Sequence, residues 1–168
     1  MAFDAAVRLG VYDEHLKWAI LRIKNASQEG LAETLGEMLG STHQTRLISF
    51  KPDLIVPIPL HWRKRLGRGY NQSQALARGL GFLLGISPSP SCLKRLRHTP
   101  EQHLTTSTTA RKKNVQGAFF ASARVAGRRV LLVDDVMTTG ATAHEAARAL
   151  KKQGATEVFL AIIARTRG

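Results

Sequence analysis

The chain has 168 residues, 43% of them hydrophobic, which is enough to bury one substantial core but too little for two independent ones. It carries 25 Lys and Arg against 12 Asp and Glu, a formal net charge of +13 that points to a polyanionic partner. Phosphate-rich small molecules, single-stranded nucleic acid and an anionic membrane surface all satisfy that charge. Cys92 is the only cysteine, which excludes a disulfide framework or a cysteine-based zinc site within this chain and favours a reducing, cytoplasmic setting.

The first fifty residues have a helical pattern. Charged residues interrupt the apolar ones near the start of the chain, which argues against a signal peptide or a membrane span. From Leu16 to Leu39 the apolar residues recur at helical spacing with one break in the middle, and this predicts two short helices. Lys51-Pro52-Asp53 then interrupts the pattern. We therefore expect an N-terminal helical region over residues 1–50 and a second domain over residues 51–168.

Three segments of different character follow. Leu54-Ile55-Val56 is a short apolar run that ends in Pro57-Ile58-Pro59, the pattern of a buried strand leading into a stiff loop. Ser73 to Gly85 is rich in Ala and Leu, begins with a capping-type Ser and ends on Gly, which predicts a helix. Lys94 to Asn114 carries many basic residues and almost no apolar periodicity, so a long mobile loop is expected there.

The C-terminal part predicts a β-loop-α-β unit. Val130 to Val133 is an apolar run too short for a helix and bounded by charge, as in a central parallel strand. A helix is expected from Ala141 to Gln153, with Gly154 as its stop, and Val158 to Ala164 makes another strand. Such a unit favours a right-handed parallel crossover. The predicted fold class is α/β, with a parallel central sheet flanked by helices.

Polar residues fill the loop between this strand and this helix. Asp134 and Asp135 come at the carboxyl end of the strand, and three threonines flank Gly140 at the start of the helix. Unpaired backbone N–H groups at a helix N-terminus can surround a phosphate monoester, and a glycine allows close approach. The two carboxylates would repel a phosphate, so they should face hydrogen-bond donors or positive charge, such as ribose hydroxyls. The predicted phosphate ligands are Thr138, Thr139, Gly140, Ala141 and Thr142.

A purely structural interpretation of the same loop is a capping box formed by Thr142 and Glu145, with the aspartates as turn formers that end the strand. Capping explains neither the adjacent carboxylates nor the three threonines around a glycine. A loop that binds phosphate and ribose explains both, and it is the interpretation we prefer.

The run from Val130 to Thr142 resembles the thirteen-residue phosphoribosyl diphosphate motif of type I phosphoribosyltransferases, with four apolar residues, two acids and a T-T-G-x-T tail. Segments further upstream narrow the resemblance to the ComF family of competence-related phosphoribosyltransferase-like proteins. These segments are Val56-Pro57-Ile58-Pro59-Leu60, Arg68-Gly69-Tyr70-Asn71-Gln72, Gln102, Arg111-x-x-Asn114 and Gly117-Ala118-Phe119. The resemblance covers the chain from about Leu54 to the C-terminus.

The resemblance implies a ligand and a metal. The ligand is 5-phosphoribosyl 1-diphosphate with Mg²⁺, a metal that prefers substrate phosphates and waters to a full protein cage. Asp134 and Asp135 would hold the Mg²⁺ through ligand or water, and these two acids and Arg111 are the expected catalytic residues. Many family members begin with a four-cysteine zinc module, which this chain lacks, so no zinc is expected in this chain. The family also implies a link to competence and DNA uptake.

Further ligand contacts are expected upstream of the motif. In type I phosphoribosyltransferases the loop after the strand that corresponds to Leu54-Ile55-Val56 holds the diphosphate. In this chain that loop is a basic segment, which suits a diphosphate. The alternative is a solvated basic turn in which Trp62 packs. The loop over residues 94–114 corresponds to the flexible loop that closes over the ligand and shields the reaction from water. His98 and His103 lie in it without a further ligand nearby, which predicts polar surface and not a metal site. The expected contacts in these segments are Leu60, His61, Arg63, Arg68, Asn71, Gln102, Arg111 and Asn114.

Two functions satisfy these observations. The first is transfer of the phosphoribosyl group to a nitrogen nucleophile, with diphosphate leaving C1 through an oxocarbenium-like state. The second is a non-catalytic sensor of phosphoribosyl diphosphate that binds single-stranded DNA through basic residues outside the pocket and stacks bases on Trp18 or Trp62. A purely structural scaffold does not explain an intact ligand loop. The basic residues of the second function are Arg8, Lys17, Arg22, Arg124, Arg128, Arg129, Lys151, Lys152, Arg165 and Arg167.

Overall fold

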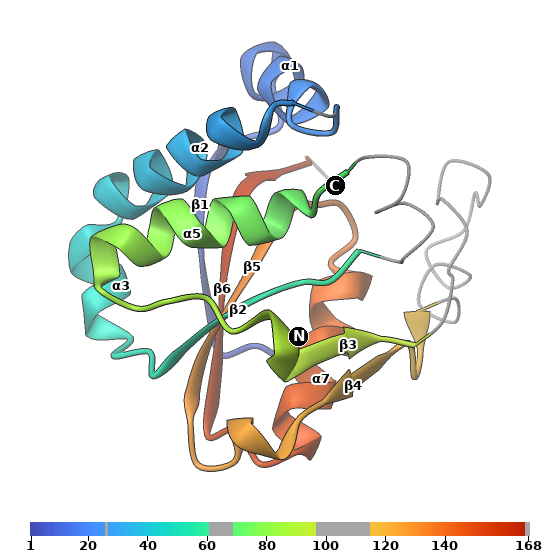
Figure 1. Cartoon of the computed structure of the whole chain (residues 1–168). Helices are drawn as coiled ribbons and strands as arrows, with labels where there is room; N and C mark the ends of the chain where they lie inside the picture. Colours follow the sequence, from blue (N-terminus) through green and yellow to red (C-terminus); the bar gives the residue numbers. More distant parts are fainter. Residues whose placement is uncertain (26, 61–68, 97–114, 167–168) are drawn as a thin grey trace.

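A four-stranded parallel sheet forms the centre of the computed structural model, which describes residues 1–25, 27–60, 69–96 and 115–166. The strand order is β1-β6-β5-β2, and helices cover both faces of the sheet (Figure 1). The α/β class with a parallel central sheet flanked by helices is therefore confirmed. The four strands are β1 (Ala5–Val11), β2 (Leu54–Pro57), β5 (Arg129–Met137) and β6 (Glu157–Arg165).

One face of the sheet packs against helices from the first half of the chain. Leu131 and Val133 of β5 and Phe159 of β6 point into this layer. The two short helices predicted from Leu16 to Leu39 are present, and they are the first two helices of this layer. None of the described helices is long and apolar enough to cross a membrane. The helices are α1 (Glu14–Arg22), α2 (Glu29–Thr42), α3 (Gln44–Ser49) and α5 (Gln72–Leu84).

The opposite face packs against α7 (Ala141–Lys152) and a small antiparallel pair, β3 (Leu93–Arg95) and β4 (Phe119–Ala121). Val130 and Leu132 of β5 point into this second layer. Because β5 is buried on both faces from Val130 to Val133, this part of its sequence is a continuous apolar run with no alternation. Two short 3₁₀ turns, Pro90–Cys92 and Ala123–Val125, flank the β3–β4 pair.

Helix α5 is held against α2 by a close backbone crossing. A Cβ atom on Gly79 would lie 2.0 Å from the carbonyl oxygen of Glu33, and one on Gly36 would lie 2.1 Å from that of Leu76. Only glycine permits such an approach. The crossing fixes α5 against α2, and the first turn of α5 lies beside the carboxyl-terminal half of β5.

The expectation that residues 1–50 are helical is wrong for β1, which pairs in parallel with β6 at the edge of the sheet. Its pattern is weak because Arg8 and Gly10 interrupt a short apolar run. Tertiary contacts decide its conformation: the Asp4 carboxylate accepts a hydrogen bond from the Val158 N–H at 2.7 Å, and β6 supplies the ladder. The domain boundary near residue 50 stays a prediction.

Strand β5 is longer than its apolar run. It continues to Met137 because β6 goes on pairing with it, with Asp134 opposite Ile162 and Val136 opposite Ala164. The two aspartates therefore lie inside the strand and not after it. Of the loop expected at residues 94–114, the structure places Lys94 and Arg95 in β3 instead, and residues 97–114 lie outside the described part of the chain.

Candidate functional site

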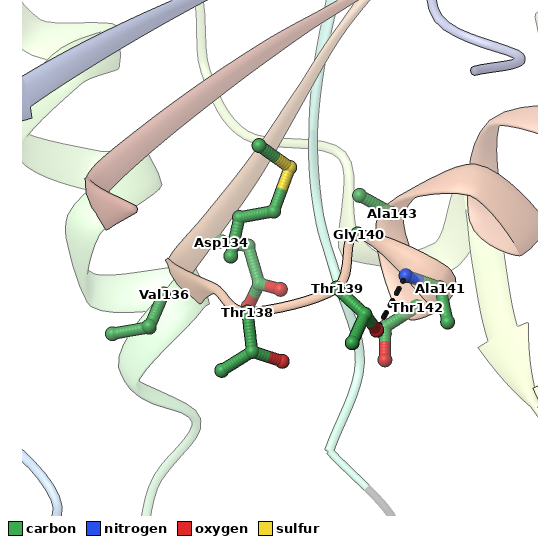
Figure 2. A pocket seen from close by; sticks show the side chains of 9 residues that line it. Asp134, Val136, Thr138, Thr139, Gly140, Ala141, Thr142 and Ala143 are labelled. Carbon is green, nitrogen blue, oxygen red and sulfur yellow. Dashed lines mark hydrogen bonds between the residues drawn. The ribbon is translucent and has the colours of Figure 1, made fainter. Parts of the chain in front are cut away.

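A pocket lies at the carboxyl end of β5, where the strand leads into α7. Figure 2 shows the carboxyl group of Asp134 and the hydroxyls of Thr138, Thr139 and Thr142 gathered around the connecting loop. The pocket is open to solvent, and the empty space in it, open solvent included, is about 230 Å³. Its lining comprises Asp134 and every residue from Val136 to Ala143.

The loop between β5 and α7 turns at Gly140. Gly140 adopts the left-handed conformation, with φ +76°, and precedes the first residue of α7. The N-cap residue Gly140 has no side chain to cap α7, and the Ala141 N–H donates a hydrogen bond to the Thr139 hydroxyl at 3.4 Å. The positive end of the helix dipole therefore faces the pocket.

The capping box between Thr142 and Glu145 does not form. The Glu145 carboxylate instead accepts the N–H of Gly117 at 2.6 Å and both the Nε and a terminal nitrogen of Arg148 at 2.9 and 2.6 Å. Hydrogen bonds from Arg148 outweigh the effect of burial and lower the pKa of Glu145. With Glu145 engaged elsewhere, the capping explanation of the loop is wrong.

The two adjacent aspartates point in different directions because successive side chains of a strand alternate. Asp134 lines the pocket, while Asp135 is only 8% exposed. Asp135 Oδ2 accepts a hydrogen bond from the Gln72 amide at 3.1 Å, and Asp134 Oδ1 accepts one from the Ser73 hydroxyl at 3.0 Å. The first turn of α5 thus contacts both carboxyl groups.

Burial and the adjacent charge of Asp135 raise the pKa of Asp134 to about 8. Hydrogen bonds from the Asp135 N–H and from Ser73 oppose this shift, as does the positive charge of Arg95, but they are weaker. A bound cation, or a ligand that donates hydrogen bonds to the carboxylate, would favour the ionised form. Binding of such a ligand would therefore stabilise the ionised acid pair.

Only some of the other predicted contacts fall within the described residues. Leu60 follows β2, whose pairing with β5 places it at the same edge of the sheet as the aspartates. Asn71 caps α5, since its side chain accepts the Ser73 N–H at 3.2 Å and donates to the Ile58 carbonyl at 3.1 Å. Its ligand contact stays a prediction. His61, Arg63, Arg68, Gln102, Arg111 and Asn114 lie outside the described residues.

Gln72 and Ser73 were not predicted as site residues, although both contact the aspartates. Gln72 belongs to the R-G-Y-N-Q segment that narrowed the family resemblance, and that was the available signal. Ser73 was interpreted only as a helix cap. Their proximity to residues more than sixty positions away depends on how α5 packs on β5, which no local pattern shows.

Several basic residues assigned to nucleic-acid binding are paired with acids. Such pairs at the surface leave less charge for phosphates. Arg22 has a different environment, because its guanidinium lies 4.7 Å from the ring centroid of the exposed Trp18. The pairs are Lys17–Glu14 at 3.8 Å, Arg128–Asp53 at 3.9 Å, Arg129–Glu157 at 2.9 Å and Lys151–Asp4 at 2.8 Å.

The sequence of this chain matches a known protein family. A family model described as the phosphoribosyl transferase domain matches residues 26–168. The chain belongs to this family. The match includes the whole of the acid pair and the threonine–glycine loop, and it extends into the N-terminal helices beyond the region covered by the sequence resemblance.

Similar proteins narrow the assignment. Competence protein F of Haemophilus influenzae is 35% identical over 167 residues, which covers 94% of this chain and 71% of that protein. DNA utilization protein YhgH of Escherichia coli K12 is 34% identical over 163 residues, with 95% and 71% covered. Competence protein ComFC of Bacillus subtilis is 28% identical over 149 residues, with 85% and 56% covered. The chain is a phosphoribosyltransferase-like protein of the ComF family, as the upstream segments predicted.

Two solved structures share the fold of this phosphoribosyltransferase-like chain. They are the allosteric regulatory enzyme of purine biosynthesis and glutamine phosphoribosylpyrophosphate amidotransferase from Bacillus subtilis, complexed with ADP and GMP. Each superposes with a TM-score of 0.54 at 25% sequence identity over 78% of this chain. The chain spans only 25% of the length of either protein, so the likeness concerns one part of each.

Proposed function

We propose that the chain binds 5-phosphoribosyl 1-diphosphate with Mg²⁺ and transfers the phosphoribosyl group to a nitrogen nucleophile. The observation that carries this proposal is the pocket at the end of β5, where the N-terminus of α7 and the carboxyl group of Asp134 face the same small space. The first suits a phosphate monoester and the second suits sugar hydroxyls. One ligand that contains both groups is a ribose 5-phosphate unit.

Each part of the pocket has a separate task in this proposal. The N–H groups and hydroxyls of the loop from Thr138 to Thr142 bind the 5-phosphate, and Gly140 lets the backbone approach it. Asp134 accepts hydrogen bonds from the ribose hydroxyls. The N-terminal end of α7 adds a favourable dipole for the phosphate charge. The ligand is thereby fixed with its C1 away from the loop, open to an incoming nucleophile.

The residues present suit Mg²⁺. Asp134 and Asp135 supply hard carboxylate oxygens, and a cation would favour the ionised form of Asp134, whose pKa is raised by burial and by the charge of Asp135. These two acids would hold the ion through ligand or water, and the ion would supply positive charge to the diphosphate. In the reaction, the nitrogen of the acceptor forms a bond to C1 and the C1–O bond to diphosphate breaks. The acceptor nitrogen loses a proton, and diphosphate leaves with the bonding electrons.

The similarity to proteins named for competence and DNA utilization supports a role in the use of DNA taken up by the cell. A second candidate is a non-catalytic sensor that binds single-stranded DNA. The observation that favours it is Trp18, 59% exposed beneath Arg22, which is the arrangement of a base-stacking platform. Trp18→Ala should lower single-strand affinity measurably at low salt. Equal binding by wild type and variant, or no binding at all, would remove this candidate.

The proposed function is tested by calorimetric titration of phosphoribosyl diphosphate, with and without Mg²⁺. Wild type should bind only with Mg²⁺, and the double variant Asp134→Asn/Asp135→Asn should not bind. A matched control is Glu14→Gln/Glu37→Gln, which removes the same charge from exposed helix positions and should bind normally. Diphosphate release on addition of ammonia or a nitrogen base then tests turnover. Binding without release from any such acceptor would favour the sensor, and absence of binding to wild type would refute the proposal.

A further inference from the structure

The acid pair is fastened to the first turn of α5 by two buried side chains. Gln72 is 3% exposed and Ser73 is 2% exposed. Gln72 Nε2 donates to Asp135 Oδ2 at 3.1 Å, and Ser73 Oγ donates to Asp134 Oδ1 at 3.0 Å. Helix α5 is itself locked to α2 by the glycine crossing, so these two donors sit on a rigid support.

These hydrogen bonds leave one oxygen of the pair for a ligand. Asp135 Oδ1 accepts the Val136 N–H at 2.7 Å and Asp135 Oδ2 accepts Gln72, so both its oxygens are engaged. Asp134 Oδ1 already accepts from Ser73 and from the Asp135 N–H at 3.0 Å. Across the described residues, Asp134 Oδ2 is the carboxylate oxygen of the pair that receives no hydrogen bond, and Asp134 is the one that lines the pocket.

Burial of the Gln72 side chain does not favour the stability of the fold. Among the described residues no group donates to its buried Oε1 atom, and a buried oxygen without a donor is unfavourable. An apolar side chain of similar length would avoid that penalty. The side-chain amide of Gln72 makes a single hydrogen bond, to Asp135. This is expected of a residue whose role is to orient a carboxylate.

We propose that Gln72 and Ser73 are positioning residues, which orient the Asp134–Asp135 pair so that the pocket distinguishes ribose from 2-deoxyribose. This inference rests on the proposed binding of a ribose 5-phosphate unit. Gln72 holds Asp135, and Ser73 turns Asp134 so that its free oxygen meets a ribose hydroxyl. The threonine–glycine loop binds the phosphate independently of both. Loss of the positioning bonds therefore weakens recognition of the hydroxyls and leaves phosphate binding intact.

The test compares ribose 5-phosphate with 2-deoxyribose 5-phosphate by calorimetric titration in Mg²⁺. Wild type should prefer the ribose compound by about tenfold, the usual scale of a hydrogen bond to a charged group. Ser73→Ala should abolish that preference by weakening ribose 5-phosphate alone, because Ser73 orients the acid with the free oxygen, and Gln72→Met should reduce it. Gln74→Met makes the same substitution two residues further along α5, away from the acids, and should preserve the preference. If thermal melting shows that Gln72→Met does not fold, Ser73→Ala decides the outcome.

The possible results separate the two proposals. A preference that survives in the Gln72 and Ser73 variants, or equal weakening of both sugars, overturns the positioning role and leaves the proposed function standing. Wild type that binds both sugars equally overturns the positioning role as well. Wild type that binds neither sugar phosphate nor phosphoribosyl diphosphate overturns the proposed function, and the positioning role with it.

Discussion

Replacing Asp134 with Asn should make the ligand-free protein more stable at neutral and alkaline pH. Burial and the charge of Asp135 raise the pKa of Asp134 from 3.8 to about 8. The asparagine side chain of the Asp134→Asn variant would keep an oxygen for the two hydrogen bonds that Asp134 Oδ1 accepts from Ser73 and from the Asp135 N–H. The substitution therefore removes an unfavourable charge and retains the contacts.

The sign follows from proton linkage. Between about pH 4 and pH 8 the folded protein keeps the Asp134 proton while the unfolded chain has lost it, so the free energy of unfolding falls as pH rises. The difference between 3.8 and about 8 corresponds to at most roughly 5 to 6 kcal/mol at pH 8. Because Asp134 lines an open pocket and is partly exposed, water reduces this, and we expect about 1–3 kcal/mol.

Urea unfolding at several pH values from 5 to 8 measures the effect. The Asp134→Asn variant should be nearly as stable as wild type at pH 5 and increasingly more stable towards pH 8. Glu37→Gln removes one exposed carboxylate and controls for the change in net charge on a strongly basic protein. A stability difference that does not change with pH, or an Asp134→Asn variant that is less stable than wild type at pH 8, would refute the reasoning.

Two further predictions concern glycines. Gly79→Ala should lower the free energy of unfolding by about 3 kcal/mol, because the new Cβ would lie 2.0 Å from the Glu33 carbonyl oxygen. Gly30→Ala places its Cβ in open space and should leave the free energy of unfolding unchanged. Urea unfolding of the two variants measures the difference. Gly140→Ala should weaken binding of inorganic phosphate, because its φ is +76° within the loop. Gly127→Ala has a similar φ of +71° away from the pocket and should leave phosphate affinity unchanged in the same titration, so equal affinities in both variants would contradict the assignment.

Local patterns in the sequence were enough to predict the family and the elements around the candidate site. The apolar run from Val130 to Val133, the two acids and the threonine–glycine sequence each have a local physical meaning: a buried strand, a repulsive charge pair and a helix start with backbone close to an anion. None of these depends on a distant part of the chain. The loop between β5 and α7 and the phosphoribosyltransferase family could therefore be predicted from consecutive residues.

Contacts between distant residues were decided only by the tertiary structure. Edge strand β1 forms because its backbone pairs in parallel with β6, although its own apolar pattern is weak. Glu145 caps nothing because Gly117 and Arg148 compete for its carboxylate. Both acids accept a hydrogen bond from the first turn of α5, which lies more than sixty residues earlier in the chain, but only Asp134 lines the pocket. Such pairings arise from the packing of helices on a twisted sheet, and residue spacing along the chain carries no record of them.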